Sequence, residues 1–233
     1  MHGVFITGTN TGVGKTHIGV LLARALCSRG IRVIPRKPIE SGCKYIDGEL
    51  VPEDAHALME ASDYTGTLSE ICPYRFEPPV SPVRAAHLAK KALNTEHLVK
   101  VCLNNNNGDF TLVEGAGGFY SPLAEDGLNA DLAVALQLPV LLVTEDTLGC
   151  LNHVLLNAEA IQLRGLMLAG VVLNNIRKQQ HGPMDNAADL RNRLPCPAFT
   201  QRFSCGGDAI ADGLLEHILT LPDVHHMTRM AIY

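Results

Sequence analysis

The stretch Gly-Thr-Asn-Thr-Gly-Val-Gly-Lys-Thr, residues 8–16, combines glycines, a lysine and a threonine in an order that binds phosphate groups. Five residues separate Gly8 from Gly14, one more than in the common phosphate-binding loop. An apolar run precedes the stretch and an amphipathic one follows, so it should join a strand to a helix. Backbone N–H groups and the helix dipole would hold a phosphate there, while Lys15 would add a positive charge and Thr16 a hydroxyl ligand for Mg²⁺. The motif predicts nucleotide binding but does not identify the reaction.

Two further side chains are expected at the edge of the sheet where the strands end. Glu114 ends the run Phe-Thr-Leu-Val and precedes the glycine-rich loop 115–118, so it could ligate a metal beside the phosphates. Lys37 ends a second run and could neutralise charge that develops during phosphoryl transfer. For both, a solvated side chain at a strand end is the alternative explanation. Ser41 could contact a small substrate, whereas Asp54 is equally well explained as a favourable charge at a helix N-terminus.

Short apolar runs alternate with longer stretches of helical periodicity, the pattern of a parallel sheet covered by helices on both faces. We expect strands at 4–7, 32–37, 110–114, 140–144 and 168–173. We expect helices at about 15–29, 53–61, 83–103, 129–136, 150–164, 184–194 and 208–219, with loops at 38–52 and 63–82. The prediction is an α/β fold that is P-loop NTPase-like, with three α/β/α layers and a mostly parallel central sheet. No repeat or linker interrupts residues 1–233, so we expect a single domain.

Composition limits the partners and the location of the protein. Of the 233 residues 46% are hydrophobic and 18% charged, which is typical of a globular protein, and the net charge is -5. No basic run reaches five residues, so we expect neither nucleic acid nor a membrane surface as a partner. No apolar run reaches the roughly 18 residues that span a bilayer, and the N-terminus lacks the charged region of a signal peptide. The seven cysteines form no Cys-x-x-Cys pair, which favours a reducing, cytoplasmic location.

Several motifs together resemble those of the dethiobiotin synthetase family. In chain order they are GTNTGVGKT, KPIESG, PEDA, SPVRAA, LVEGAGG, TLGCLNH and VVLNN. Their order and spacing are similar to the family over residues 3–176, about three quarters of the chain. In that family the longer phosphate-binding loop is the normal form, so the extra residue marks a branch of P-loop enzymes.

The resemblance implies an ATP-dependent ligase. In the family's reaction, CO2 and one amine of 7,8-diaminononanoate form a carbamate, which attacks the γ-phosphate of ATP to give a carbamic-phosphoric anhydride. The neighbouring amine then closes a cyclic urea, and ADP and phosphate are released. Mg²⁺ as cofactor, ATP as co-substrate and a homodimer as the working assembly are implied with it.

For the nucleotide, the resemblance implies residues of the phosphate-binding loop, two acids, the glycine-rich loop and the end of the last strand. They are Gly12, Val13, Gly14, Lys15, Thr16, His17, Asp54, Glu114, Gly115, Ala116, Gly117, Asn174 and Asn175. Within this set Thr16, Asp54 and Glu114 would surround Mg²⁺. Asn174 matches an asparagine that contacts adenine.

For catalysis, the resemblance implies Lys15 and Lys37 beside the transferred phosphoryl group, with Thr11 near the reacting end of the substrate. The implied substrate-binding residues are Ser41, Ser81, Pro82, Cys150, Leu151 and Asn152. The last three would receive the substrate's carboxylate across the dimer interface, because N–H groups at a helix start near Cys150 can bind an anion.

Some segments depart from the family pattern, and two alternatives stay open. The match is poor after residue 176, and residues 200–203 stand where many members carry Gly-Glu-Ile-Pro beside the base. A P-loop amide synthase of the cobyrinate type would share the loop and sheet but usually has a glutamine amidotransferase domain, which does not fit after residue 176. A MinD- or ParA-like ATPase switch would carry a lysine where this chain has Asn10.

The ten histidines lack metal-ligand spacing, and Cys43 is expected to play no catalytic part.

Overall fold

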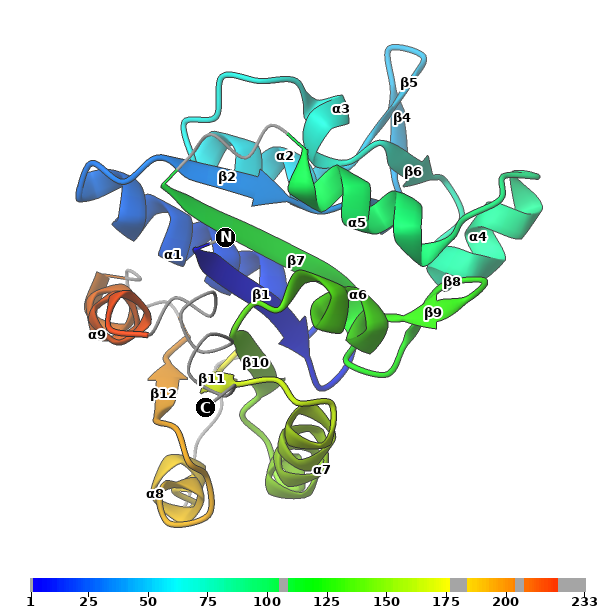
Figure 1. The fold of residues 1–233 in the computed structure, drawn as a ribbon. Coiled ribbons are helices and arrows are strands. Elements are labelled where there is room, and N and C mark those ends of the chain that lie inside the picture. The colour runs from blue at the N-terminus through cyan, green and yellow to red at the C-terminus, as the bar shows by residue number, and fades with distance from the viewer. Residues whose placement is uncertain (1, 105–108, 177–183, 204–207, 222–233) are drawn as a thin grey trace, which may run out of the picture.

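A computed structural model describes residues 2–104, 109–176, 184–203 and 208–221 of the chain. Its centre is a sheet of six strands in the order β12-β11-β10-β1-β7-β2 (Figure 1). The strands are β1 (Gly3–Gly8), β2 (Val33–Arg36), β7 (Phe110–Gly118), β10 (Val140–Glu145), β11 (Leu168–Asn174) and β12 (Ala198–Gln201). Every neighbouring pair in this sheet is parallel. All six strands therefore end at the same edge, where ligands bind in folds of this kind.

Helices cover both faces of the sheet (Figure 1). One face carries α1 (Lys15–Ser28), α2 (Glu53–Ala61) and α9 (Asp208–Leu219), and the other carries α5 (Thr95–Leu103), α6 (Asn129–Leu136), α7 (Cys150–Leu163) and α8 (Asn186–Arg191). A hydrophobic core lies on each side, and alternate residues of β1 serve the two cores. Val4 and Ile6 belong to the first core and Phe5 to the second. The predicted three-layer α/β/α fold is confirmed.

Smaller elements lie between β2 and β7 and between β7 and α6. They are β3 (Ile39–Ser41), β4 (Lys44–Ile46), β5 (Glu49–Val51), α3 (Leu68–Ile71), β6 (Tyr74–Phe76), α4 (Pro82–Leu88), β8 (Pro122–Ala124) and β9 (Gly127–Leu128). β3 and β6 form a parallel pair, and β4 and β5 form a hairpin that projects from the body of the protein (Figure 1). β3 begins only three residues after β2 ends, so its residues lie close to the carboxyl end of β2.

The predicted strands and most predicted helices are confirmed to within a few residues. The single helix expected at 83–103 is wrong, because α4 and α5 are separate helices. Lys90 has a left-handed backbone with φ of 54°, which ends the first helix. The Asn94 side chain then accepts a hydrogen bond of 2.9 Å from the His97 N–H and caps the second.

The extent of the predicted loops is also corrected. The segments 38–52 and 63–82 contain the short elements β3 to β6, α3 and the start of α4. β12 was not expected, because Ala-Phe-Thr-Gln is a four-residue edge strand in which half of the residues are polar. Within the described segments, no helix combines the length and the apolar character needed to span a membrane.

Candidate active site

The phosphate-binding loop joins β1 to α1 and is fixed at its end by Asn174, the last residue of β11. Asn174 Nδ2 donates a 2.9 Å hydrogen bond to the carbonyl oxygen of Val13. Gly14 has φ of 92°, and a Cβ on it would lie 2.0 Å from the same nitrogen of Asn174. Both conformation and space therefore require glycine here. The loop is held so that N–H groups at the start of α1 can meet an anion.

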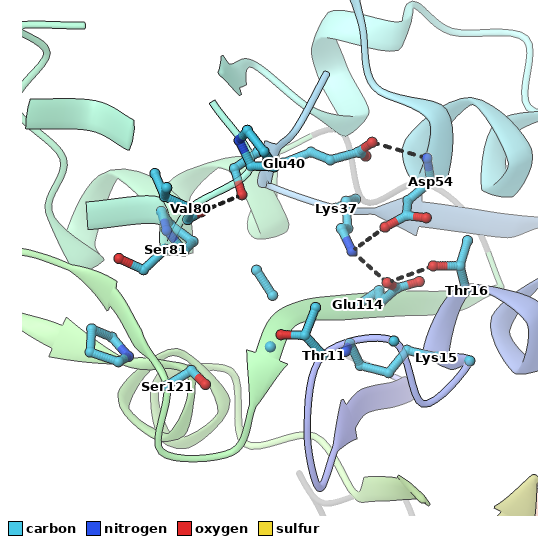
Figure 2. A pocket seen from close by; sticks show the side chains of 18 residues that line it. Thr11, Lys15, Thr16, Lys37, Glu40, Asp54, Val80, Ser81, Glu114 and Ser121 are labelled. Atoms are coloured by element: carbon cyan, nitrogen blue, oxygen red, sulfur yellow. Dashed lines mark hydrogen bonds and ion pairs between the residues drawn. The ribbon is translucent and has the colours of Figure 1, made fainter. Parts of the chain in front are cut away.

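Lys37 and Glu114 meet because their strands are neighbours. β2 and β7 pair in parallel, in a register that places the residue after β2 beside Glu114. Lys37 Nζ lies 2.5 Å from Glu114 Oε1 and 3.0 Å from Asp54 Oδ2 (Figure 2). The Thr16 hydroxyl, at the start of α1, donates to Glu114 Oε1 at 3.0 Å. Three residues that the sequence patterns singled out therefore form one cluster with Asp54, which only the family resemblance implied; the three are Thr16, Lys37 and Glu114.

Burial and charge oppose each other in this cluster. Burial alone would lower the pKa of Lys37, but the carboxylates of Glu114 and Asp54 outweigh it and hold the pKa above its ordinary value. Burial would raise the pKa of Asp54, but the nearby Lys37 ammonium holds it below its ordinary value. The Glu114 side chain is fully buried, and its Oε2 atom has no hydrogen-bond partner in the described part of the chain. One carboxylate oxygen is therefore left over for a ligand.

Lys15 lies in a different environment. Its Nζ donates to the carbonyl oxygen of Asn10 at 3.3 Å, and it forms no ion pair with a carboxylate among the described residues. Burial, with repulsion from Lys37, lowers the pKa of Lys15 to about 8. An ammonium held in this way gains from a phosphate partner.

These side chains line a cavity of about 710 Å³ (Figure 2). Its wall also includes Thr11, Ser41, Ser81 and Pro82, which the resemblance assigns to catalysis or the substrate. The Ser41 hydroxyl donates to the carbonyl oxygen of Val80 at 2.7 Å and so ties β3 to the turn before α4. The volume is that of a small-molecule site, and the phosphate-binding loop forms one side of it.

Asn129, which belongs to no sequence motif singled out above, holds the glycine-rich loop against this cavity. Its Oδ1 accepts from the Ala116 N–H at 3.0 Å, and its Nδ2 donates to the carbonyl oxygens of Ala116 at 2.5 Å and Gly118 at 3.0 Å. Gly117 has φ of 79°, and a Cβ there would lie 2.8 Å from Ser121 Oγ. Ala116 and Gly117 form part of the cavity wall. The glycines therefore allow a tight turn next to the ligand space.

Comparison with known proteins decides the family. A family model described as an AAA domain matches residues 2–224. The ATP-dependent dethiobiotin synthetase BioD of Anaeromyxobacter sp. (strain K) is 41% identical over 204 residues, which cover 87% of each chain. The protein of the same name from Cellvibrio japonicus (strain Ueda107) is 39% identical over 221 residues, 94% of this chain and 96% of that one. This chain belongs to the ATP-dependent dethiobiotin synthetase family.

Solved structures resemble the chain in fold. The cell division ATPase MinD of Pyrococcus furiosus has a TM-score of 0.53 at 17% identity and covers 95% of this chain and 100% of its own. The septum site-determining protein MinD of Pyrococcus horikoshii OT3, complexed with Mg-ADP, has a TM-score of 0.51 at 19% identity over 93% of this chain and 86% of its own. At such identities the likeness concerns the fold alone. It lends no support to the ATPase-switch alternative over the dethiobiotin synthetase family.

Several residues assigned from the dethiobiotin synthetase resemblance do not line the cavity. They are Val13, His17, Gly115, Cys150, Leu151, Asn152, Asn174 and Asn175. His17 lies exposed on α1. Both asparagines at the end of β11 contact other parts of the protein, since Asn174 Nδ2 donates to the Val13 carbonyl oxygen and Asn175 Nδ2 donates to Asp146 Oδ2 at 3.4 Å. α7 begins at Cys150 as predicted, but that residue's N–H donates to the carbonyl oxygen of Thr147 at 3.1 Å. Their ligand contacts stay predictions.

The donor set fits the Mg²⁺ that the dethiobiotin synthetase resemblance implies. Mg²⁺ prefers oxygen ligands and is usually held by one or two carboxylates together with water and substrate phosphates. Glu114 offers an unpartnered buried oxygen, and Asp54 and the Thr16 hydroxyl lie around the same Lys37–Glu114 pair. Across the described segments, no group of three or more His, Cys, Asp and Glu side chains could hold a metal by itself.

Glu40 on β3 is a residue of the site that the sequence did not reveal. Its side chain lines the cavity, yet the residue is only 7% exposed. Burial is the main reason that its pKa is raised to about 7, against the opposing effect of the Lys37 ammonium. Its partners are backbone N–H groups of α2, which no residue pattern in the sequence indicates.

Proposed function

We propose that this chain closes a cyclic urea on 7,8-diaminononanoate with CO2 and ATP, as the detailed form of the dethiobiotin synthesis for which its family is named. The observation that carries the proposal is the position of Lys37. Its ammonium contacts Glu114 and Asp54 at the wall of a cavity shared by the phosphate-binding loop and by Ser41 and Ser81. Groups for phosphoryl transfer and for a small polar substrate therefore share one space.

The proposed chemistry has three bond-forming steps. An amine nitrogen attacks CO2 and loses a proton, which gives a carbamate. A carbamate oxygen attacks the γ-phosphorus of ATP, and the bond from that phosphorus to the bridging oxygen of ADP breaks. The second amine attacks the carbamoyl carbon, the carbon–oxygen bond to phosphate breaks, and phosphate and a proton leave.

The chain's own residues would act by position and charge. Lys15 and Lys37 would neutralise the phosphoryl oxygens from two sides, because one lies in the phosphate-binding loop and the other at the end of β2. Thr11, Ser41 and Ser81 would orient the diamine and its carbamate from the cavity wall. No side-chain nucleophile is required.

We also propose Thr16, Asp54 and Glu114 as the residues that hold Mg²⁺, which when bound would neutralise charge on the phosphates. Asn174 is proposed to contact the adenine, although its Nδ2 holds Val13 in the free protein. A base contact would therefore use its remaining oxygen or require a shift of the amide. Replacing Asn174 by Asp and comparing ATP with GTP as co-substrate tests this assignment.

We propose further that residues 1–233 form one domain, and that it works as a homodimer in the cytoplasm. Cys150, Leu151 and Asn152 start a helix but lie away from the cavity of their own chain, so a carboxylate site there would serve a second copy. Leu148, just before this helix, is 94% exposed, which suits a surface that another chain covers. Light scattering on the purified protein would give the mass of the assembly.

The direct test is incubation with ATP, Mg²⁺, 7,8-diaminononanoate and bicarbonate labelled with ¹³C and ¹⁸O. Mass spectrometry should find ¹³C in the cyclic urea and ¹⁸O in the released phosphate, since the carbamate oxygen leaves with phosphorus. ADP release should require both the diamine and bicarbonate. ADP release that instead required lipid, DNA or a partner protein would favour the ATPase switch, and amide formation from glutamine would favour the amide synthase.

A further inference from the structure

Glu40 caps the helix that carries Asp54. α2 begins at Glu53 after Pro52, and Pro52 provides no side-chain cap for the first N–H groups of the helix. Glu40 Oε1 accepts from the Asp54 N–H at 3.1 Å, and Oε2 accepts from the Ala55 N–H at 3.0 Å. The Glu40 carboxylate on β3 therefore caps the N-terminus of α2, a function that the residue directly before a helix usually performs.

This cap also determines where Asp54 can reach. The backbone of Asp54 is held by Glu40, while its side chain bonds to Lys37 at 3.0 Å (Figure 2). Lys37 and Glu40 belong to the same short segment, separated by Pro38 and Ile39. The two contacts therefore close a ring from Lys37 through Asp54 to Glu40 and back along the chain, and this ring fixes α2 against the end of β2.

The dipole of α2 favours the same arrangement, against the burial that raises the pKa of Glu40 to about 7. The Glu40 carboxylate faces the positive end of the α2 dipole, where an acid is stabilised. Glu53 at the same helix end points elsewhere, because its side chain is exposed and pairs with Lys44 at 2.7 Å. Glu40 and Glu53 thus both stand near the helix N-terminus that carries Asp54, but of these two only Glu40 contacts the Asp54 N–H in the described structure.

We propose that Glu40 is a positioning residue for the reaction: through the Asp54 and Ala55 N–H groups it holds the Asp54 carboxylate at Lys37 and at the metal side of the site. The proposal rests on the proposed function, because it assigns Glu40 to that same site. Glu40 acts through Asp54, and it has no covalent or proton-transfer role. Partners that orient a metal-binding carboxylate typically change metal affinity or activity by about 10- to 100-fold when they are removed.

The test compares Glu40→Gln with Glu53→Gln, which removes the same charge from the same helix end without touching the Asp54 N–H. Glu40→Gln should raise the Mg²⁺ concentration for half-maximal dethiobiotin formation, and lower kcat, by about ten-fold. Glu53→Gln should leave both within about two-fold of the wild type, because an exposed ion pair contributes little. Thermal melting of both variants shows whether a loss reflects unfolding, and Glu40→Asp, too short for both contacts, gives a second variant if the first does not fold.

A double-variant cycle separates positioning from a general loss of stability. If Glu40 acts through Asp54, adding Glu40→Gln to Asp54→Asn should reduce the remaining turnover by less than about two-fold. A full ten-fold further loss in that background would overturn the proposal. The proposal would also be overturned if the wild type is active and Glu40→Gln and Glu53→Gln have the same kcat and the same Mg²⁺ requirement.

Two readouts do not depend on turnover. Hydrogen exchange at the Asp54 and Ala55 amides should be at least ten-fold faster in Glu40→Gln, and calorimetry should show weaker binding of Mg-ADP. Absence of dethiobiotin formation in the wild type would refute the proposed function, while these two measurements would still decide the role of Glu40. Unchanged amide exchange together with unchanged Mg-ADP binding would overturn the positioning role of Glu40.

Discussion

Lys15 and Lys37 carry the same charge, yet their removal should change stability in opposite directions. Lys37→Met would leave Glu114, whose side chain is fully buried, and Asp54 without their counter-ion. Breaking a buried pair by removing one partner costs about 3–5 kcal/mol of folding free energy. We expect Lys37→Met to lose that amount, and the double variant Lys37→Met/Glu114→Gln to recover part of it without recovering activity.

Lys15→Met should be neutral or stabilising in the absence of nucleotide. Burial and Lys37 lower the pKa of Lys15 from 10.5 to about 8, so folding works against its charge. A shift of that size corresponds to on the order of 3 kcal/mol at neutral pH. Turnover should nevertheless fall by at least about 100-fold in both single variants, because each removes a charge that we propose to stabilise the transferred phosphoryl group.

The sign of the pH effect follows from the lowered pKa of Lys15. Between pH of about 8 and 10.5 the unfolded chain binds a proton at Lys15 that the folded chain has released, so this residue makes stability rise with pH. Two cysteines have the opposite effect on stability, since burial raises the pKa of the half-buried Cys196 to about 11 and of the buried Cys102 to about 12. The effect of Lys15 is isolated by the difference in free energy of unfolding between the wild type and Lys15→Met. This difference should decrease as the pH rises from about 8 to 10.5.

Urea denaturation from pH 7 to 10.5 measures these free energies, and the labelled-product assay measures turnover. The reasoning about the buried pair is refuted if Lys37→Met unfolds at the same urea concentration as the wild type. The reasoning that burial disfavours the charge of Lys15 is refuted if Lys15→Met loses as much free energy of unfolding as Lys37→Met.

Three further outcomes are expected. Thr16→Val should lower Mg²⁺-supported turnover by about 100-fold but cost only about 1 kcal/mol of stability, since it removes one hydrogen bond to Glu114. Steady-state kinetics over a Mg²⁺ titration measures the first effect, and urea denaturation measures the second. Unchanged kinetics would remove Thr16 from the proposed metal site. Gly14→Ala places a Cβ against Asn174 at φ of 92° and should lose about 1–3 kcal/mol and most ATP affinity, measured by melting and calorimetry; normal ATP binding would contradict the tight-loop geometry. Asn129→Ala frees the glycine-rich loop and should raise KM for the diamine several-fold with a loss of about 1–3 kcal/mol, and an unchanged KM would separate that loop from the substrate.

The central part of the site is predictable because it follows from strand order. Runs that end in Lys37 and Glu114 are recognisable as parallel strands, and parallel strands end at one edge of a sheet. The phosphate-binding loop lies in the same sheet, at the end of β1. Its motif and the two strand ends are therefore enough to place Lys15, Thr16, Lys37 and Glu114 together.

The remaining contacts depend on tertiary packing that leaves no local pattern. Asp54 looked like an ordinary acid at a helix start, and its contact with Lys37 exists because α2 packs at the end of β2. Glu40 and Asn129 bind backbone groups 11 to 15 residues away in the sequence, so their residue type alone does not reveal them. The helix predicted at 83–103 failed for a different reason: the cap at Asn94 is a local signal, but the apolar periodicity on both sides of it was interpreted as one continuous helix.

The contact between Lys37 and Glu114 would affect how Mg²⁺ reaches the site proposed for it. A divalent ion that arrives alone must displace an ammonium tethered to the same chain, whose effective concentration beside the carboxylates is very high. An ion already chelated by a triphosphate brings anions that give the displaced lysine a new partner. At the proposed magnesium site, a free cation would therefore compete poorly, and the ion would enter mainly as its complex with the nucleotide.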